Sequence, residues 1–272
     1  MPYDVTDFQS LMALESHGPD VFVGIGPAYP WGGLYGGQVV AQALRAACHT
    51  VDEDHLPHSL HAYFIRAGDT EEPIRFEVDR IRNGRSFVTR RVVARQSIGP
   101  ILNLSASFQI RESNQSDVQT QSMPDVAAPE DLEPDHWGPI LSRRSIKPEK
   151  GVPHSAAWLK IAQEIGEDPI LQACGLAYAS DDIPTEAASL AHPKRPDPYH
   201  DAENYSDVFV GASLDHAIWF HRPGRHDEWV LHDFEGRGLV GARGLAVGEI
   251  FSRDGVHVAT IAQEILQRER TR

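Results

Sequence analysis

The sequence contains little cysteine and no long apolar run. Only two cysteines, Cys48 and Cys174, occur among 272 residues, and both fall in segments with helical patterning. This usage favours buried thiols in a reducing compartment over a disulfide framework. No apolar run approaches the length of a membrane-spanning helix, and the first residues lack the basic and apolar regions of a signal peptide. We therefore expect a cytoplasmic protein with no membrane span.

Positive charge is also scarce. The chain has 25 Lys and Arg against 39 Asp and Glu, which gives a formal net charge of −14. A field of this sign repels phosphates, so it argues against a general nucleic-acid or anionic-membrane surface. The hydrophobic content of 41% and charged content of 24% are ordinary for a globular protein. We expect no nucleic-acid partner.

Several familiar catalytic and binding motifs are missing. No Gly-Lys-Ser/Thr follows the glycine-rich stretch, Gly24-x-Gly26 lacks a third glycine, and no Gly-x-Ser-x-Gly occurs. A nucleotide fingerprint and an α/β serine hydrolase are therefore disfavoured. His58 and His61 are three residues apart in a strand-like run, which places them on opposite faces. We expect neither a metal nor a cofactor.

The best-defined pattern is a glycine-rich turn at residues 32–37 that leads directly into a helix. Apolar residues follow it at the i, i+3, i+4 and i+7 spacing of a buried helix: Val40, Ala43, Leu44 and Ala47. Three strand-like runs come next, Arg75–Arg82, Ser86–Gln96 and Ile101–Ile110. A helix this apolar needs a sheet face to cover it, so we predict a curved antiparallel sheet wrapped around the helix.

The remainder of the chain repeats this plan after a connection. Residues 112–142 are polar and proline-containing, with acidic residues but neither Lys nor Arg. This composition is typical of a linker, and it predicts an N-terminal unit over 1–112, a linker over 113–155 and a C-terminal unit over 156–272. In the C-terminal unit the pattern predicts a buried helix over 170–179, a loop over 181–206 and a single strand over 208–222.

Local sequence matches support a duplication. Residues 217–224 resemble 61–68, and two further matches follow in order, all at separations of 152 to 156 residues. Gln263 corresponds to Gln109 in this repeat, whereas the counterpart of Asp215 is Ser59. Ordered matches at nearly constant spacing indicate two copies of one fold. The first copy is expected to be structural.

Six stretches resemble the bacterial acyl-CoA thioesterase II family. They occur in the family's order over nearly the whole chain: residues 35–44, 58–69, 84–87, 106–109, 214–223 and 254–264. The resemblance implies an α+β double hotdog fold, in which two units of a helix inside an antiparallel sheet stand side by side in one chain. It also implies a homo-oligomer, a dimer or higher, because hotdog sheets in such families tend to pair edge to edge.

The resemblance implies hydrolysis of fatty acyl-CoA to free fatty acid and CoA by an activated water, without a covalent serine. Its Asp falls on Asp215, which would act as general base, and its Gln falls on Gln263, which would hold the water or donate to the oxyanion. Backbone amides at the helix N-terminus, at Gly36 and Gly37, would bind the substrate carbonyl. By themselves, Asp215 and Gln263 are ordinary strand residues.

The family also has a Ser or Thr shortly before an Ala/Ser-Arg-Gly, and the corresponding segment here, residues 234–244, contains no hydroxyl residue. Counting back from Arg243 places that position on Gly236 or Arg237. Arg237 either stabilises the oxyanion or pairs with Asp215 and lowers its basicity. The alternative function is therefore an acyl-CoA-binding hotdog protein with weak or no turnover. A hydratase of the same fold is a third hypothesis, against which the lack of an Asp-x-x-x-x-His motif counts.

Two further groups of side chains are candidates for contacts to the substrate. An arginine-dense run over residues 80–95 has the pattern of a solvated strand face, but in an acidic chain it is the best local match for the phosphates of CoA. We assign Arg85 and Arg91 to that role. His58 is included among the substrate-binding candidates, although packing or hydrogen bonding is the simpler role for a histidine in that strand.

Overall fold

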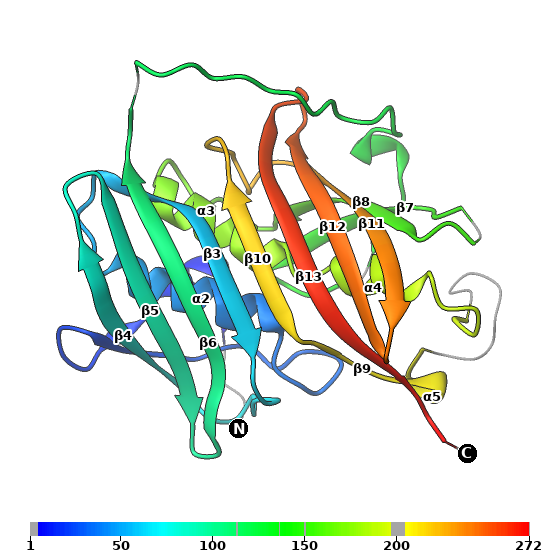
Figure 1. The fold of residues 1–272 in the computed structure, drawn as a ribbon, viewed down its shortest axis with the longest axis horizontal. Helices are drawn as coiled ribbons and strands as arrows, with labels where there is room; N and C mark the ends of the chain where they lie inside the picture. Colours follow the sequence, from blue (N-terminus) through cyan, green and yellow to red (C-terminus); the bar gives the residue numbers. More distant parts are fainter. Residues whose placement is uncertain (1–4, 113, 136, 150, 197–204, 272) are drawn as a thin grey trace.

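The computed structural model describes residues 5–112, 114–135, 137–149, 151–196 and 205–271, and its strands form one sheet (Figure 1). The first half of the chain contributes β1 (Glu15–Ser16), β2 (Val21–Gly24), β3 (His55–Phe64), β4 (Ile74–Asn83), β5 (Phe87–Gln96) and β6 (Gly99–Ile110). The second half contributes β7 (Leu141–Ile146), β8 (His154–Ile161), β9 (Phe209–Ser213), β10 (Asp215–Phe220), β11 (Val230–Val240), β12 (Arg243–Ser252) and β13 (His257–Glu269). The helices are α1 (Phe8–Met12), α2 (Gly36–Cys48), η1 (Pro129–Asp131), α3 (Pro169–Ala179), α4 (Pro184–Ser189) and α5 (Tyr205–Val208).

The two halves meet along a seam between β3 and β10. The strand order is β1-β2-β4-β5-β6-β3-β10-β13-β12-β11-β8-β7, with β9 paired to β13. Across the seam, antiparallel pairing places Ala217 opposite His61 and Trp219 opposite Ser59. The seam makes one continuous sheet from the two repeated halves.

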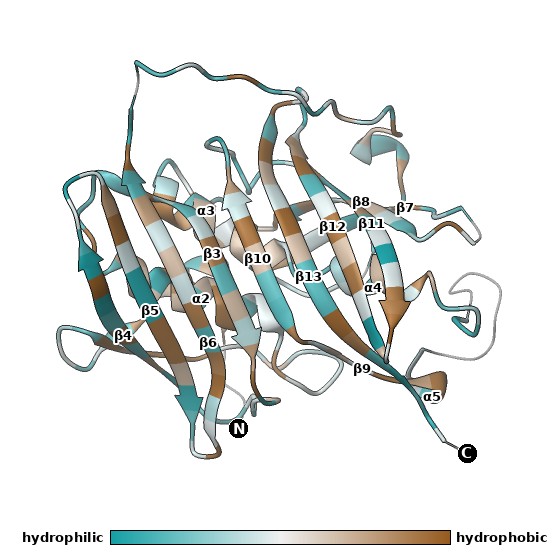
Figure 2. Ribbon diagram, viewed as in Figure 1, coloured by the Kyte–Doolittle hydropathy of each residue, from teal (hydrophilic) through white to brown (hydrophobic). Residues whose placement is uncertain are grey.

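The helices cover one face of this sheet (Figure 1), and α2 packs against α3. Almost every residue of α2 is buried, including the polar Gln38 and Gln42. Gln42 is satisfied because its amide nitrogen donates to the carbonyls of Leu11 and Ile25, each at 2.9 Å. Residues alternate between hydrophobic and hydrophilic along the strands (Figure 2), as the opposite faces of a half-covered sheet require. The predicted α+β class, with a helix enclosed by an antiparallel sheet, is confirmed.

The two long helices begin differently. At α3, the Asp168 carboxylate accepts hydrogen bonds from the backbone N–H groups of Ile170 and Leu171, at 2.9 and 3.4 Å, and Pro169 occupies the first turn. At α2, the residue before the helix is Tyr35, whose side chain makes no capping hydrogen bond. The first-turn N–H groups of α2 are therefore open to another acceptor, whereas those of α3 are already capped.

Two expected elements differ from the structure. The expected loop over 181–206 contains α4 in its described part, and residues 197–204 lie outside the described residues. The expected single strand over 208–222 is two strands, β9 and β10, that end and begin on either side of Leu214. Leu214 itself bridges two strands, because its N–H donates to Glu264 and its carbonyl accepts from Phe64, each at 2.9 Å.

The connection between the halves is partly packed onto the second half. The expected linker over 113–155 contains β7 and the first residues of β8. Apolar side chains of the connection, among them Met123, Val126 and Leu132, pack against a small cluster formed by Ala156, Trp158, Leu231 and Phe251. These contacts bury apolar surface that an extended solvated tether would expose. None of the described helices has the length and hydropathy needed to cross a membrane.

Candidate active site

Asp181 lies between the end of α3 and the beginning of α2. It follows the C-cap of α3, Ser180, and its side chain is buried although it is ionisable. Its Oδ1 accepts a hydrogen bond from the Ser213 hydroxyl at 3.1 Å. The backbone N–H of Gly37, in the uncapped first turn of α2, donates to the same carboxylate. The helix N-terminus of one half of the chain thus faces a carboxylate from the other half.

Ser213 and Gln263 complete a cluster with Asp181. Ser213 is the last residue of β9, and Gln263 projects from the middle of β13, where it is fully buried. The Gln263 amide nitrogen donates to the Ser213 hydroxyl oxygen at 2.9 Å. We call Asp181, Ser213 and Gln263 the carboxylate cluster. Buried polar side chains that are joined by hydrogen bonds hold one another in a single arrangement.

The environment of Asp181 changes its basicity. Burial raises the pKa of the Asp181 carboxyl from its ordinary value of 3.8 to about 7, although hydrogen bonds from Gln263, Ser213 and the Gly37 backbone act in the opposite direction. The neighbouring Asp182 carboxylate adds to the upward shift. A carboxylate with a pKa near neutrality accepts a proton from water more readily than an ordinary aspartate does.

Glycine is required at both positions that face this carboxylate. A Cβ at Gly36 would lie 2.5 Å from Asp181 Oδ2 and 3.0 Å from the Phe64 ring. A Cβ at Gly37 would lie 2.2 Å from the carbonyl oxygen of Tyr178. The absence of side chains lets the backbone of α2 approach the carboxylate closely.

The structure brings three of the predicted site residues, Gln263, Gly36 and Gly37, to one place but not Asp215. Successive strand residues point to opposite faces, and His216, the next residue after Asp215, is the one that contacts Gln263. Asp215 therefore lies on the other face of the sheet, where its Oδ1 accepts a hydrogen bond from the Glu264 N–H at 2.7 Å.

Arg237 is also away from the cluster. The register of β11 against β12 shifts between Gly236 and Gly238, and such a bulge re-aims the side chain at its centre. The Arg237 side chain is 54% exposed and pairs with Glu235 at 2.8 Å rather than with Asp215. The hydroxyl that residues 234–244 lack is present at Ser213, on a different strand.

The two predicted contacts to CoA phosphates are on β5 and in the turn before it. Arg85 is in the β4–β5 turn, beside Phe87, which pairs with Gln109 at the end of β6. Phe64, which contacts the Gly36 region, is at the opposite end of β3, roughly 25 Å away at 3.3 Å per strand residue. Arg91 is 51% exposed and pairs with Asp79. The structure does not bring either arginine to the cluster.

His58 lines a separate cavity of about 830 Å³. Its Nε2 is hydrogen-bonded to the Ser107 hydroxyl at 2.8 Å, and burial lowers its pKa. This cavity also contains Gln109, the repeat counterpart of Gln263, and the capped N-terminus of α3. It therefore occupies the position in the first copy that the carboxylate cluster occupies in the second, but there the helix N–H groups are occupied by Asp168.

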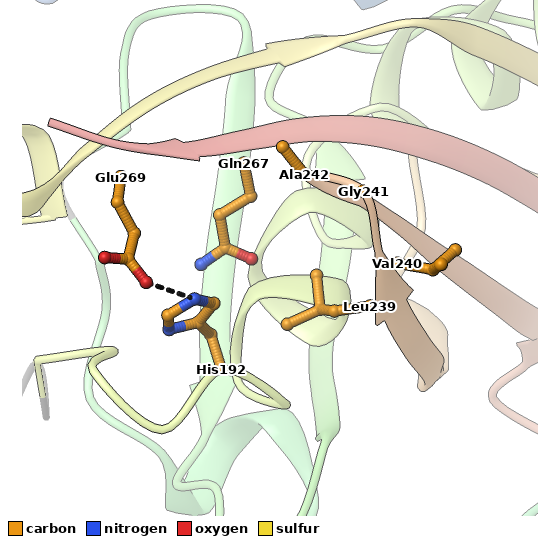
Figure 3. Close-up of a pocket in the computed structure, with 7 residues that line it drawn as sticks. All are labelled: His192, Leu239, Val240, Gly241, Ala242, Gln267 and Glu269. Atoms are coloured by element: carbon orange, nitrogen blue, oxygen red, sulfur yellow. Dashed lines mark ion pairs between the residues drawn. The ribbon is translucent and has the colours of Figure 1, made fainter.

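A smaller cavity of about 270 Å³ lies by the β11–β12 turn (Figure 3). His192 forms an ion pair with Glu269 on its wall, and the Gln267 side chain lies beside them. Among the described residues no group of three or more His, Cys, Asp and Glu side chains is arranged to hold a metal ion. Neither cavity contains a member of the carboxylate cluster.

Two members of the cluster escaped the sequence analysis. Asp181 follows a helical pattern in a Ser-Asp-Asp run and has the appearance of a helix end, while Ser213 lies two residues before Asp215, just outside the matched stretch 214–223. The sequence does show that Ser213 and Asp181 each flank an apolar element that must be buried, and a polar side chain in that position is a candidate for a buried site. The family's hydroxyl was expected within residues 234–244.

Comparisons with known proteins agree with this fold. The pattern of the family described as acyl-CoA thioesterase N-terminal domain matches residues 26–109, and that described as acyl-CoA thioesterase matches residues 132–266. Acyl-CoA thioesterase 2 of Haemophilus influenzae is 35% identical, with 95% of this chain and 96% of that protein covered. Acyl-coenzyme A thioesterase 8 of Homo sapiens is 36% identical, with 94% of this chain and 86% of that protein covered.

Solved structures give the same result. A crystal structure of an acyl-CoA thioesterase II from Mycobacterium marinum superposes with a TM-score of 0.81 at 32% identity, covering 97% of this chain and 98% of that chain. The fold is that of a double hotdog protein. The chain belongs to the acyl-CoA thioesterase II family.

Proposed function

We propose that this protein hydrolyses fatty acyl-CoA to a free fatty acid and CoA at the carboxylate cluster. Asp181 is the general base, and Ser213 and Gln263 hold the attacking water beside it. The observation that carries this proposal is the hydrogen-bonded arrangement of the three side chains opposite the uncapped N-terminus of α2. Family membership supports the substrate class.

The proposed reaction is a direct hydrolysis. Asp181 accepts a proton as the water oxygen forms a bond to the thioester carbonyl carbon. The developing oxyanion is stabilised by the Gly36 N–H in the first turn of α2, while the Gly37 N–H donates to Asp181. The carbon–sulfur bond then breaks, and the proton passes from Asp181 to the sulfur of the departing CoA. Every atom of the two products, the free fatty acid and CoA, comes from the acyl-CoA and one water molecule.

The alternative function, acyl-CoA binding without turnover, depended on the lack of a hydroxyl in residues 234–244. Ser213 supplies a hydroxyl in hydrogen-bond contact with Asp181 and Gln263, which supports catalysis instead. The proposal replaces Asp215 with Asp181 as base and gives Arg237 no role in the reaction.

The matched pair Asp181→Asn and Asp215→Asn tests this assignment. Both changes remove a carboxylate at nearly constant shape, and the amide introduced by Asp215→Asn would keep an oxygen for the Glu264 N–H. Steady-state release of CoA thiol should fall by about 100-fold or more in Asp181→Asn, the usual scale for loss of a general base, and change little in Asp215→Asn. The reverse result would return the role of base to Asp215.

We also propose that the protein forms a homo-oligomer in the cytoplasm. Large apolar side chains on the outer face of the sheet near the seam support an interface between copies: Tyr63, Trp219 and Leu245 are 63%, 38% and 41% exposed. The free, buried thiols of Cys48 and Cys174 suit a reducing compartment. Light scattering of Trp219→Lys beside wild type tests the interface, and an unchanged mass would remove Trp219 from it.

A further inference from the structure

His216 connects the carboxylate cluster to α3 and has no place in the reaction proposed above. It lies on β10 and is 1% exposed. Its Nδ1 is 2.5 Å from the Gln263 amide oxygen, and its Nε2 is 2.8 Å from the Ser180 hydroxyl oxygen. Ser180 precedes Asp181 directly, so the imidazole joins β13 to the segment that carries the base.

The hydrogen-bond requirements of the cluster determine which way the Gln263 amide must face. An ionised Asp181 only accepts hydrogen bonds, so the amide nitrogen of Gln263 has to face Asp181 and Ser213. The amide oxygen then faces His216 and needs a donor there. A neutral imidazole has one N–H, which must be on Nδ1 if the amide oxygen is to be satisfied. The Ser180 hydroxyl lies 2.8 Å from Nε2 and 3.0 Å from the Ala177 carbonyl oxygen, and with Nε2 unprotonated its one hydrogen goes to Nε2.

We propose that His216 is a positioning residue, which fixes the orientation of the Gln263 amide so that its nitrogen faces the base and the attacking water. This role rests on the proposed function of the carboxylate cluster. Without the Nδ1 donor, the amide is free to rotate, and in the rotated state its oxygen opposes the Asp181 carboxylate. Burial lowers the pKa of His216 to about 4, so the ring is neutral at the pH values where Asp181 ionises.

Loss of this positioning changes the pH dependence as well as the rate. Gln263 is among the donors that hold the pKa of Asp181 down. When the amide rotates away, that pKa rises and the acid limb of the rate profile moves to higher pH. The other described groups that act on Asp181 stay in place: the Ser213 hydroxyl, the Gly37 N–H and the neighbouring Asp182, with Tyr35 close by.

The test compares four substitutions by steady-state kinetics over pH 5–9. His216→Leu removes the donor, and we expect kcat to fall by about 10- to 100-fold, the scale of a misplaced catalytic group, with KM within about threefold of wild type. His216→Asn places an amide nitrogen where Nδ1 stood and should recover most of kcat. His216→Gln places its amide at the Nε2 position and should not. His232→Leu is the matched control, since His232 is also 1% exposed and lies outside the cluster.

His232→Leu is expected to lose stability while keeping kcat, KM and pH profile. If His216→Leu behaves in the same way as this control, the positioning role is wrong. Should His216→Leu fail to fold, the comparison of His216→Asn with His216→Gln decides, and equal kcat values for those two variants would overturn the proposal.

A double-mutant cycle with Gln263→Ala separates this inference from the proposed function. If His216 acts through Gln263, His216→Leu has no further effect on kcat in the Gln263→Ala background. A further loss as large as in wild type would show that His216 acts elsewhere and would overturn the proposal. Wild-type turnover by Gln263→Ala would instead remove Gln263 from the reaction, which is a failure of the proposed function itself.

Discussion

The hydroxyl oxygen of Ser213 lies 3.1 Å from Oδ1 of Asp181, although the two residues are 32 positions apart in the sequence. The contact joins the end of a strand to the end of a helix, and the hydroxyl also accepts from Gln263. Ser213 is therefore placed to fix the position of the Asp181 carboxylate relative to the Gln263 amide. It is also placed to bind the water that these two groups share.

Two replacements of Ser213 should distinguish the chemical role of its hydroxyl from the effect of side-chain volume. Ser213→Ala removes one hydrogen bond to the carboxylate and one to the amide, and we expect kcat to fall by about 10- to 100-fold, equivalent to the loss of one or two charge-assisted hydrogen bonds. Ser213→Thr keeps the hydroxyl and should retain most activity. Release of CoA thiol measures both, and full activity in Ser213→Ala would remove the hydroxyl from the reaction.

The rate should depend on pH through Asp181. A general base works only when deprotonated, and burial raises the pKa of this carboxyl to about 7. The value of kcat/KM for acyl-CoA should therefore fall as the pH drops below about 7, approaching a tenfold loss per pH unit. A profile that stays flat down to pH 5 would mean that a group with an ordinary carboxylate pKa, such as an exposed aspartate, is the base.

A methyl group at Gly36 should block the site without disturbing the fold elsewhere. The added Cβ of Gly36→Ala would lie 2.5 Å from Asp181 Oδ2, so either the carboxylate or α2 has to shift. We expect kcat to fall by at least about tenfold, because a displacement of about 1 Å in a catalytic group can cost 100-fold. Gly33→Ala is a suitable control, since a Cβ there meets only the edge of Trp31 at 3.9 Å.

Buried histidines should make the protein sensitive to acid. Burial lowers the pKa of His226 to about 4 and that of His232 to about 3. In the unfolded chain a histidine titrates near 6.5, so below that pH the unfolded state binds more protons and the free energy of unfolding decreases. Asp181, with its raised pKa, acts in the opposite direction between about pH 4 and 7, and so does Asp182, whose pKa is also raised by burial, but these two carboxyls oppose several histidines.

Denaturant unfolding at pH 7.5 and 5.0 measures this effect. We expect a loss of stability of a few kcal/mol at the lower pH, since each unit of pKa difference corresponds to about 1.4 kcal/mol. The change in the free energy of unfolding between the two pH values should be smaller in His232→Leu, in which one titrating group is absent. Equal stability at the two pH values would show that these rings are accessible to protons in the folded protein.

The fold was predictable because it depends on local sequence patterns that occur in both halves of the chain. The helix after the glycines and the strands over 75–110 follow from the spacing of apolar residues, and the duplication follows from ordered local sequence matches. The structure confirms the fold that these patterns predict. Gln263 and the glycines were predicted because their motifs are contiguous. Asp181 and Ser213 were not, because their roles arise from burial and from contacts 32 and 50 residues away in the sequence, between Asp181 and Ser213 and between Ser213 and Gln263.

Asp215 and His216 show how a sequence motif leaves the face of a sheet undetermined. In a strand, a shift of one position exchanges the two faces of the sheet. Asp215 and His216 stand side by side in the sequence, yet only His216 faces Gln263. A motif gives the position along the chain, whereas the face is set by which neighbours the strand must bury.

The seam between β3 and β10 has a consequence for how the two copies depend on each other. The helix N-terminus at Gly37 belongs to the first copy, and the carboxylate at Asp181 belongs to the second. Two separate proteins would have to meet before any substrate was processed, so activity would vary with their abundance. One chain gives the halves a fixed, high effective concentration and a one-to-one ratio, and it leaves the second, capped helix free to accumulate changes without loss of turnover.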